Sequence, residues 1–130
     1  MKRFVAVLAL VIAIAPLAGS EQQNQPIHGA RTYVWDVSDL DAPVLVGHHD
    51  SALPVIDHNL YVKGNRIYES NYRSGLRVFD NSTPTAPTQI GFFDTYPEDD
   101  GQEFNSLWSN YPYFASGTII GGDIEKGLLV

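Results

Sequence analysis

Short runs of apolar and polar residues, separated by Gly, Pro, Asn and Asp, fill the chain from residue 31 to residue 130. The runs are rich in Val, Ile, Tyr, Phe and Trp, which is typical of β-strands. No segment after Glu21 keeps a helical spacing of apolar residues. The pattern predicts an all-β fold with these strands: Tyr33–Val37, Val44–His49, Leu60–Val62, Arg66–Asn71, Leu76–Asp80, Thr88–Phe93, Tyr111–Ala115, Thr118–Gly122 and Leu128–Val130.

Part of this sequence is repeated. The segment VWDVSDLDAPVLVGHHD (residues 34–50) returns forty-four positions later as VFDNSTPTAPTQIGFFD (residues 78–94). A second similarity, at an offset of fifty-two, relates residues 60–78 to residues 112–130 and matches Tyr61 with Tyr113 and Ile67 with Ile119. Repeats of roughly 40 to 50 residues with four strands each are typical of β-propeller blades.

The repeats therefore predict antiparallel four-stranded blades of a β-propeller, about two to two and a half of them in an incomplete ring. The propeller segment is residues 32–130, and it divides into a half blade at 32–50, a full blade at 57–94, an insertion loop at 95–110 and a partial blade at 111–130. Closed propellers have about four to eight blades. We therefore expect open blade edges, which favour self-association.

The residues shared by the repeats are those that turn geometry requires. The carboxylates of Asp36 and Asp80 are suited to accept backbone N–H groups in the turn that follows them. Gly47 and Gly91 interrupt the outer strands, as expected at a bulge. The other shared residues are predicted to begin an outer strand or to form a tight turn: Pro43, Pro87, Gly75 and Gly127.

A different pattern at residues 1–20 predicts a signal-peptide helix. Two basic residues precede a continuous apolar run, and small residues then fit a cut between Ser20 and Glu21. An uncleaved membrane anchor is the alternative, although the run is shorter than the roughly 20 residues that span a bilayer. Residues 21–31 are polar, contain Pro and Gly, and are predicted to be a flexible lead-in.

Composition removes several classes of function. The net charge is −7, and no basic stripe is present that would neutralise nucleic-acid phosphates or hold the mature chain on an anionic membrane. The absence of cysteine excludes disulfides and thiolate chemistry. No phosphate loop, G-x-S-x-G or other nucleophile motif is present. The sequence thus predicts neither catalytic nor cofactor-binding residues.

RVFDNSTPTAPTQIG (residues 77–91) resembles the LVIVD repeat. Residues 56–80, IDHNLYVKGNRIYESNYRSGLRVFD, together with IGFFDTYPEDDG and WSNYPYFASGTIIGGDIEKGLLV, are similar to the terminal repeats of choice-of-anchor B proteins. Those are large secreted or surface-attached bacterial proteins, several times longer than this chain. The resemblance covers about residues 32–130 and implies a propeller fold, export and a truncated or internally deleted member. It implies no catalytic residue or cofactor.

One group of possible metal ligands lies in GHHDSALPVIDH, which contains His48, His49, Asp50, Asp57 and His58. Imidazole and carboxylate groups bind zinc and similar ions. However, adjacent residues on a strand point to opposite faces, so His48 and His49 are not expected to share an ion. The alternative, which we favour, is hydrogen-bonded histidines at strand ends, with His58 buried and bonded to the backbone.

A second group is acidic. DTYPEDDGQEF contains Asp94, Glu98, Asp99, Asp100 and Glu103, and carboxylates on an extracellular loop suggest calcium as the one possible cofactor. The ligand spacing of an EF-hand loop is absent, so a solvated acidic loop is the favoured interpretation. Of both groups, His48, Asp50, His58, Asp99 and Asp100 remain the candidate metal ligands.

Together these observations predict a non-catalytic repeat module, secreted or at the cell surface, that contacts an extracellular protein or glycan. Trp108 and Tyr96, on the predicted insertion, are candidates for a contact surface. Two alternatives stay open. One is a fragment of a metal-dependent extracellular hydrolase, built on residues 48–58 and the acidic loop, and the other is a non-functional gene fragment.

Overall fold

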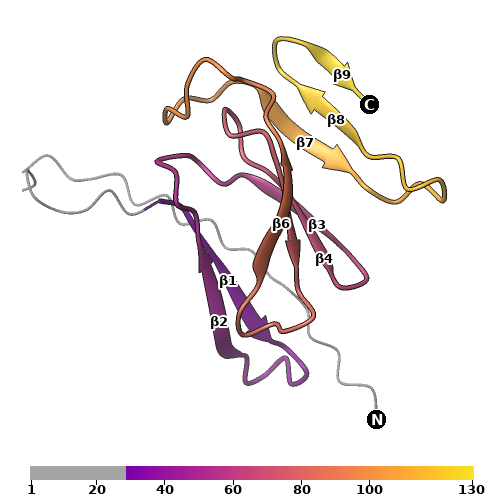
Figure 1. Cartoon of the computed structure of the whole chain (residues 1–130). Coiled ribbons are helices and arrows are strands. Elements are labelled where there is room, and N and C mark those ends of the chain that lie inside the picture. The colour runs from indigo at the N-terminus through magenta and orange to yellow at the C-terminus, as the bar shows by residue number, and fades with distance from the viewer. Residues whose placement is uncertain (1–28) are drawn as a thin grey trace, which may run out of the picture.

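The computed structural model describes residues 29–130 (Figure 1). The predicted signal peptide and nearly all of the predicted lead-in lie outside these residues. The described residues contain strands and no helix, which confirms the all-β prediction for this part of the chain. Accordingly, no helix long and apolar enough to cross a membrane occurs within residues 29–130.

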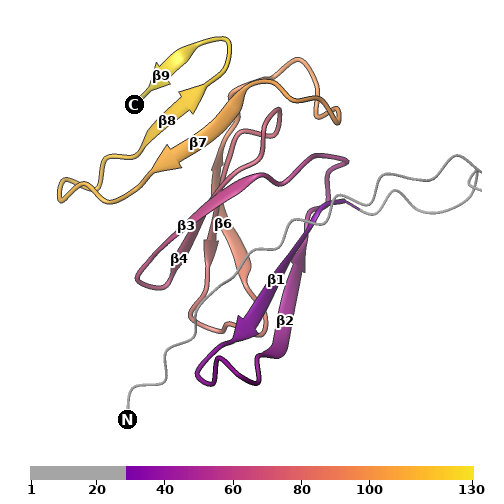
Figure 2. The same ribbon diagram turned by 180° about the vertical axis from the view of Figure 1, so that it is seen from behind.

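The strands form three antiparallel sheets. The first is a hairpin of β1 (Arg31–Asp36) and β2 (Val44–Asp50). The central sheet contains, in chain order, β3 (Asn59–Lys63), β4 (Arg66–Ser70), β5 (Leu76–Asp80) and β6 (Thr88–Phe93). The third sheet contains β7 (Leu107–Tyr111), β8 (Ile120–Asp123) and β9 (Gly127–Leu129). In both views the central sheet lies between the hairpin and the third sheet (Figures 1 and 2).

The repeated aspartates close the same turn in both copies. Asp36 Oδ1 accepts the backbone N–H of Ser38 at 2.9 Å, and Asp80 Oδ1 accepts that of Ser82 at 2.7 Å. Each turn follows the last residue of an inner strand and leads to an outer strand that starts directly after proline. The predicted function of these aspartates in turn geometry is confirmed.

The outer strands bulge at equivalent positions. On β2 the register skips Val46, which precedes Gly47, and on β6 it skips Ile90, which precedes Gly91. A bulge increases the local twist of a strand. The two copies therefore share the shape of their outer strand as well as their turn, and the predicted bulges are confirmed.

The first strand of the third sheet differs from the prediction. It was expected at Tyr111–Ala115, whereas β7 spans Leu107–Tyr111. Residues 107–110, which were expected in the insertion loop at 95–110, therefore belong to β7, and the third sheet begins four residues before the segment 111–130. The other eight strands agree with the prediction to within two residues at each end.

Contacts with the central sheet explain the position of β7. Leu107 is 2% exposed and pairs with Tyr72 through two backbone hydrogen bonds of 3.1 and 3.2 Å. The Asn110 amide donates to the Ser70 hydroxyl at 2.7 Å and to the Tyr68 carbonyl at 3.2 Å. These tertiary contacts, and not the local apolar pattern, select residues 107–111 as the strand.

The shift of β7 also changes the alignment of the repeats. Tyr113 follows β7 and lies outside the strands, whereas Tyr61 is the central residue of β3. The Tyr113 hydroxyl instead donates to the Val62 carbonyl at 2.8 Å, and its ring meets that of Tyr61 edge-on at 6.0 Å. Residues that the offset of fifty-two matched as equivalents are therefore neighbours in space.

The two faces of β4 are covered by different sheets. Side chains alternate along a strand, so Ile67 and Glu69 lie on one face and Tyr68 and Ser70 on the other. All four are buried. The hairpin covers the first face through the hydrogen bond from Thr32 to Glu69, and the third sheet covers the second through Asn110. Consequently a charged side chain on β4 lies in the interior.

Candidate functional site

The histidines of β2 point to opposite sides, as predicted. His48 is exposed, and its Nε2 lies 3.6 Å from Asp50 Oδ2, while the half-buried His49 packs its ring 4.1 Å from that of Phe79. Burial lowers the pKa of His49. Arg31 donates to both carboxylate oxygens of Asp50, at 2.5 and 2.9 Å, and thereby holds the pKa of Asp50 below its usual range. The ion pair between Arg31 and Asp50 thereby connects the start of β1 with the end of β2.

His58 bonds to the backbone of the third sheet. Its Nδ1 lies 2.8 Å from the carbonyl oxygen of Trp108, and because a carbonyl only accepts, Nδ1 carries the proton. The ring lies 4.7 Å from that of Tyr72 and 4.4 Å from that of Trp108. The predicted backbone bond is confirmed, although the residue is half-buried and not buried.

The acidic candidates lie in the loop between β6 and β7. Asp99 accepts the backbone N–H of Gly101 at 2.7 Å and the Arg73 guanidinium at 2.6 Å, and these bonds hold its pKa below the usual range. Within residues 29–130 no three His, Asp or Glu side chains come together as metal ligands would. The structure therefore does not bring His48, Asp50, His58, Asp99 and Asp100 to one place.

A pair of carboxylates that the sequence pattern does not connect lies between the hairpin and the central sheet. Asp57 is 3% exposed and Glu69 2% exposed. The Thr32 hydroxyl lies 3.1 Å from Glu69 Oε1 and 3.4 Å from Asp57 Oδ2, and the Asn71 amide donates to Glu69 Oε2 at 3.1 Å. The two acidic groups thus share one hydroxyl in the interior of the protein.

The environment of the pair favours the neutral acids. Burial raises the pKa of Asp57 to about 6, although the hydrogen bond from the Thr32 hydroxyl and the charge of Arg77 act to lower it. Burial, together with the nearby charge of Asp57, raises the pKa of Glu69 to about 7. Neutralisation of the pair, by a proton or by a cation, is consequently stabilising.

Exposed aromatic side chains gather on β7 and on the segments beside it. At one end, Trp108 is 50% exposed and Phe104 72% exposed, and both rings meet that of the buried Tyr72 edge-on. Trp108 was expected on a loop, but it is the exposed residue of a strand whose neighbour Leu107 is buried. A strand holds this indole more firmly than a loop would.

The other end of β7 carries three more rings. Tyr111, Tyr113 and Phe114 are 45%, 42% and 44% exposed, and Tyr111 meets the other two rings edge-on at 5.4 and 5.1 Å. Tyr96, the second contact residue expected from the sequence, is half-buried, with the Arg73 guanidinium 4.8 Å from its ring centre. We call the exposed set the aromatic surface: Phe104, Trp108, Tyr111, Tyr113 and Phe114.

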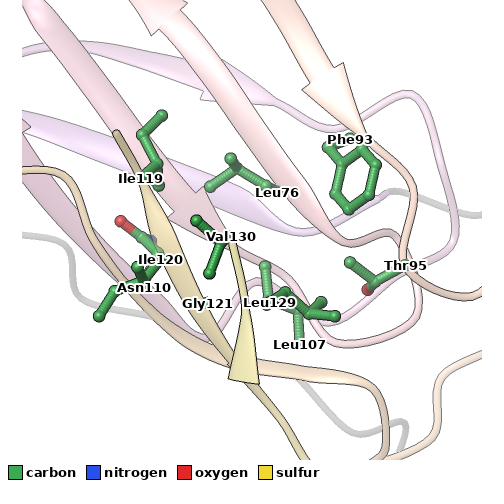
Figure 3. A pocket seen from close by; sticks show the side chains of 10 residues that line it. All are labelled: Leu76, Phe93, Thr95, Leu107, Asn110, Ile119, Ile120, Gly121, Leu129 and Val130. Carbon is green, nitrogen blue, oxygen red and sulfur yellow. The ribbon is translucent and has the colours of Figure 1, made fainter. Parts of the chain in front are cut away.

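An apolar cavity of about 150 Å³ lies between the central and third sheets (Figure 3). The close-up shows Leu76 and Phe93 of the central sheet near Leu129 and Val130. Pockets that enclose a drug-sized ligand are roughly 300 to 1,000 Å³. The cavity therefore fits one apolar side chain and not a metabolite.

Comparisons of this chain with protein-family models, with curated proteins and with solved structures gave no match. The candidate site is therefore defined by the chemistry of the chain itself. It has two parts: the carboxylate pair between the hairpin and the central sheet, and the aromatic surface on β7 and the segments beside it. The first part can bind charge, and the second can bind the surface of another molecule.

Proposed function

We propose that this chain is an exported, non-catalytic β-propeller repeat module that contacts an extracellular protein or glycan through the aromatic surface. The observation that carries the proposal is the exposure of five aromatic side chains within residues 104–114. Large aromatic side chains dominate the binding energy of protein interfaces. The sequence supports export, through the predicted signal peptide at residues 1–20.

In this proposal the three sheets are LVIVD-type blades, and the chain is related to the choice-of-anchor B proteins. The repeated turn and bulge support an equivalent role for the hairpin and for β5 and β6. Packing between neighbours supports it as well, because a Cβ on Gly47 would lie only 2.7 Å from the carbonyl of Thr85, in the turn between β5 and β6 of the central sheet. The hairpin and the third sheet would be partial blades on either side of a full one.

The geometry of the rings favours a protein partner over a glycan. Tyr111 is inclined at 71° to Tyr113 and at 72° to Phe114, so the rings form an uneven surface. Such a surface offers gaps for the side chains of a protein, whereas a sugar ring stacks best on a single flat face. Tyrosine and tryptophan also carry a polar atom beside an apolar ring, which suits a binding surface that is exposed to water when the partner is absent.

Alanine substitution of the aromatic surface tests the proposal. We expect Trp108→Ala and Tyr111→Ala each to weaken binding at least about thirtyfold, because truncation of an aromatic hot spot costs about 2 kcal/mol or more. The probes are arrays of bacterial envelope proteins and of surface polysaccharides, and biolayer interferometry then measures affinity for each ligand found.

Phe92→Ala is the matched control, because Phe92 is 63% exposed on β6 and lies outside the aromatic surface. Binding to proteins that only the first two variants lose would support the proposed protein partner. Binding to polysaccharides alone would assign the same surface to a glycan. Binding to neither array, or an equal loss in Phe92→Ala, would contradict the proposed function.

A further inference from the structure

The buried carboxylates of Asp57 and Glu69 have fewer hydrogen-bond donors than they need. The Thr32 hydroxyl has one proton for two acceptors, and Asn71 supplies one more N–H, to Glu69. Asp57 Oδ1 is buried and has no hydrogen-bond partner. None of the ion pairs found in residues 29–130 includes either carboxylate. Two buried carboxylates with so few donors need a proton or a positive charge between them.

A space of suitable size lies beside the pair. A cavity of about 10 Å³, comparable to the volume that a single water needs, is lined by both carboxylates and by Thr32 and Asn59, among others. Asp57, whose Oδ1 has no hydrogen-bond partner, is 3% exposed and lies on the wall of this cavity, which has room for one small particle.

The chemistry of the wall selects the kind of particle. Its converging side-chain ligands are oxygen atoms. The one imidazole on the wall, that of His58, bonds to the Trp108 carbonyl through Nδ1 and keeps Nε2 free, but it does not converge with the two carboxylates, since no three His, Asp or Glu side chains of residues 29–130 come together as metal ligands would. Oxygen ligands suit calcium and magnesium, whereas zinc, copper and nickel prefer nitrogen or sulfur. Magnesium keeps several of its waters and demands octahedral geometry. A cavity with room for one particle therefore favours calcium, which sheds water more readily.

We propose that Asp57 and Glu69 bind a single calcium ion that fastens the β1–β2 hairpin to the central sheet. Its ligands come from three elements: the β1 residue Thr32, Asp57 before β3, and Glu69 of β4. Two carboxylates balance the charge of the ion, and neutral oxygens complete its coordination. The site is distinct from the acidic loop at residues 94–103, and it does not depend on the proposed function.

Calcium titration of the full chain, freed of metal with EDTA, tests this proposal. At pH 8 we expect calorimetry to detect one site with a Kd of roughly 10⁻⁴ to 10⁻³ M, the range of extracellular calcium modules. Asp57→Asn is expected to weaken binding at least tenfold. Two controls are expected to bind as the native chain does: Asp41→Asn, in the exposed turn after β1, and Asp99→Asn, in the acidic loop.

Loss of binding in Asp57→Asn alone would support the site. Absence of binding by the native chain, or unchanged binding in Asp57→Asn, would overturn it, and loss in Asp99→Asn alone would move calcium to the acidic loop. A measurement on the native chain covers the case in which Asp57→Asn does not fold. Calcium is expected to raise its unfolding temperature at pH 8 and not at pH 5, where protons occupy the pair; an equal shift at both pH values would also overturn the proposal.

Discussion

Replacement of Gly75 by alanine is expected to lower the free energy of unfolding by at least about 3 kcal/mol, whereas Gly127→Ala lowers it by about 1 kcal/mol. Both glycines lie where the turn between the second and third strands of a sheet meets the third strand, Gly75 directly before β5 and Gly127 as the first residue of β9, with φ of 71° and 76°. An L-residue pays a similar cost for that backbone conformation at either position. Any difference between the two variants therefore measures what surrounds the turn.

The surroundings differ sharply. A Cβ on Gly75 would lie 2.3 Å from the Phe93 carbonyl oxygen and 2.8 Å from the Thr95 nitrogen, whereas a Cβ on Gly127 would meet nothing within 4 Å. Both obstructing atoms belong to the backbone and cannot turn aside as a side chain can. Urea unfolding followed by circular dichroism measures the two costs. Equal destabilisation would show that the end of β6 yields to the added methyl group.

The same contrast recurs at the bulges. Gly47 faces the backbone of Thr85, in the turn between β5 and β6, while a Cβ on Gly91 would again meet nothing within 4 Å. Repeated residues thus keep their local conformation in each copy, but only some of them are covered by a neighbouring element. Sequence similarity between the repeats predicts the conformation of the turn, whereas packing against neighbouring elements determines how closely the turn is enclosed.

This distinction explains which parts of the fold were predictable. Turns and bulges depend on residues a few positions apart, such as Asp80 and Ser82, so the pattern predicts them correctly. The start of β7 depends on Leu107 and Asn110, whose partners are about 35 to 42 positions away in the chain. The local pattern favoured the more aromatic segment that follows, and the predicted strand was displaced by four residues.

The candidate site shows the same limit. The backbone bond of His58 could be expected from a histidine at a strand end, and the structure has it. Nothing in the sequence indicated that Glu69 is buried, because a charged residue in an alternating strand normally faces solvent. Its burial requires a sheet on each face of β4, which is a property of the assembled sheets. Its association with Asp57 was for that reason invisible in the sequence.

In EDTA, the free energy of unfolding is expected to fall as the pH rises from about 4 to about 7. The pKa of Asp57 is raised from 3.8 to about 6 and that of Glu69 from 4.5 to about 7. The folded chain therefore holds protons that the unfolded chain has already released. Their stabilisation is complete below the unfolded pKa values and is lost as the pH rises through the folded ones.

Glu69→Gln isolates this contribution from that of other groups. Burial lowers the pKa of His49, which adds stability as the pH rises through the same range and partly offsets the fall. The arginine-paired Asp50 and Asp99 lose their contribution only at lower pH, because their pKa values are depressed. The difference between the native chain and the variant cancels these terms, since both proteins carry them.

At pH 4.5 we expect Glu69→Gln to be no more stable than the native chain. At pH 8 we expect it to be more stable, because the substitution removes one of two neighbouring buried negative charges. Urea unfolding in EDTA at several pH values measures the crossing, and stability curves that stay parallel would show that the pair does not titrate in this range. Saturating calcium is expected to remove the advantage of Glu69→Gln at pH 8, because the ion and the proton neutralise the same two oxygen-rich groups. If the two stability curves cross in EDTA and calcium leaves that crossing unchanged, protonation alone neutralises the carboxylate pair between the hairpin and the central sheet.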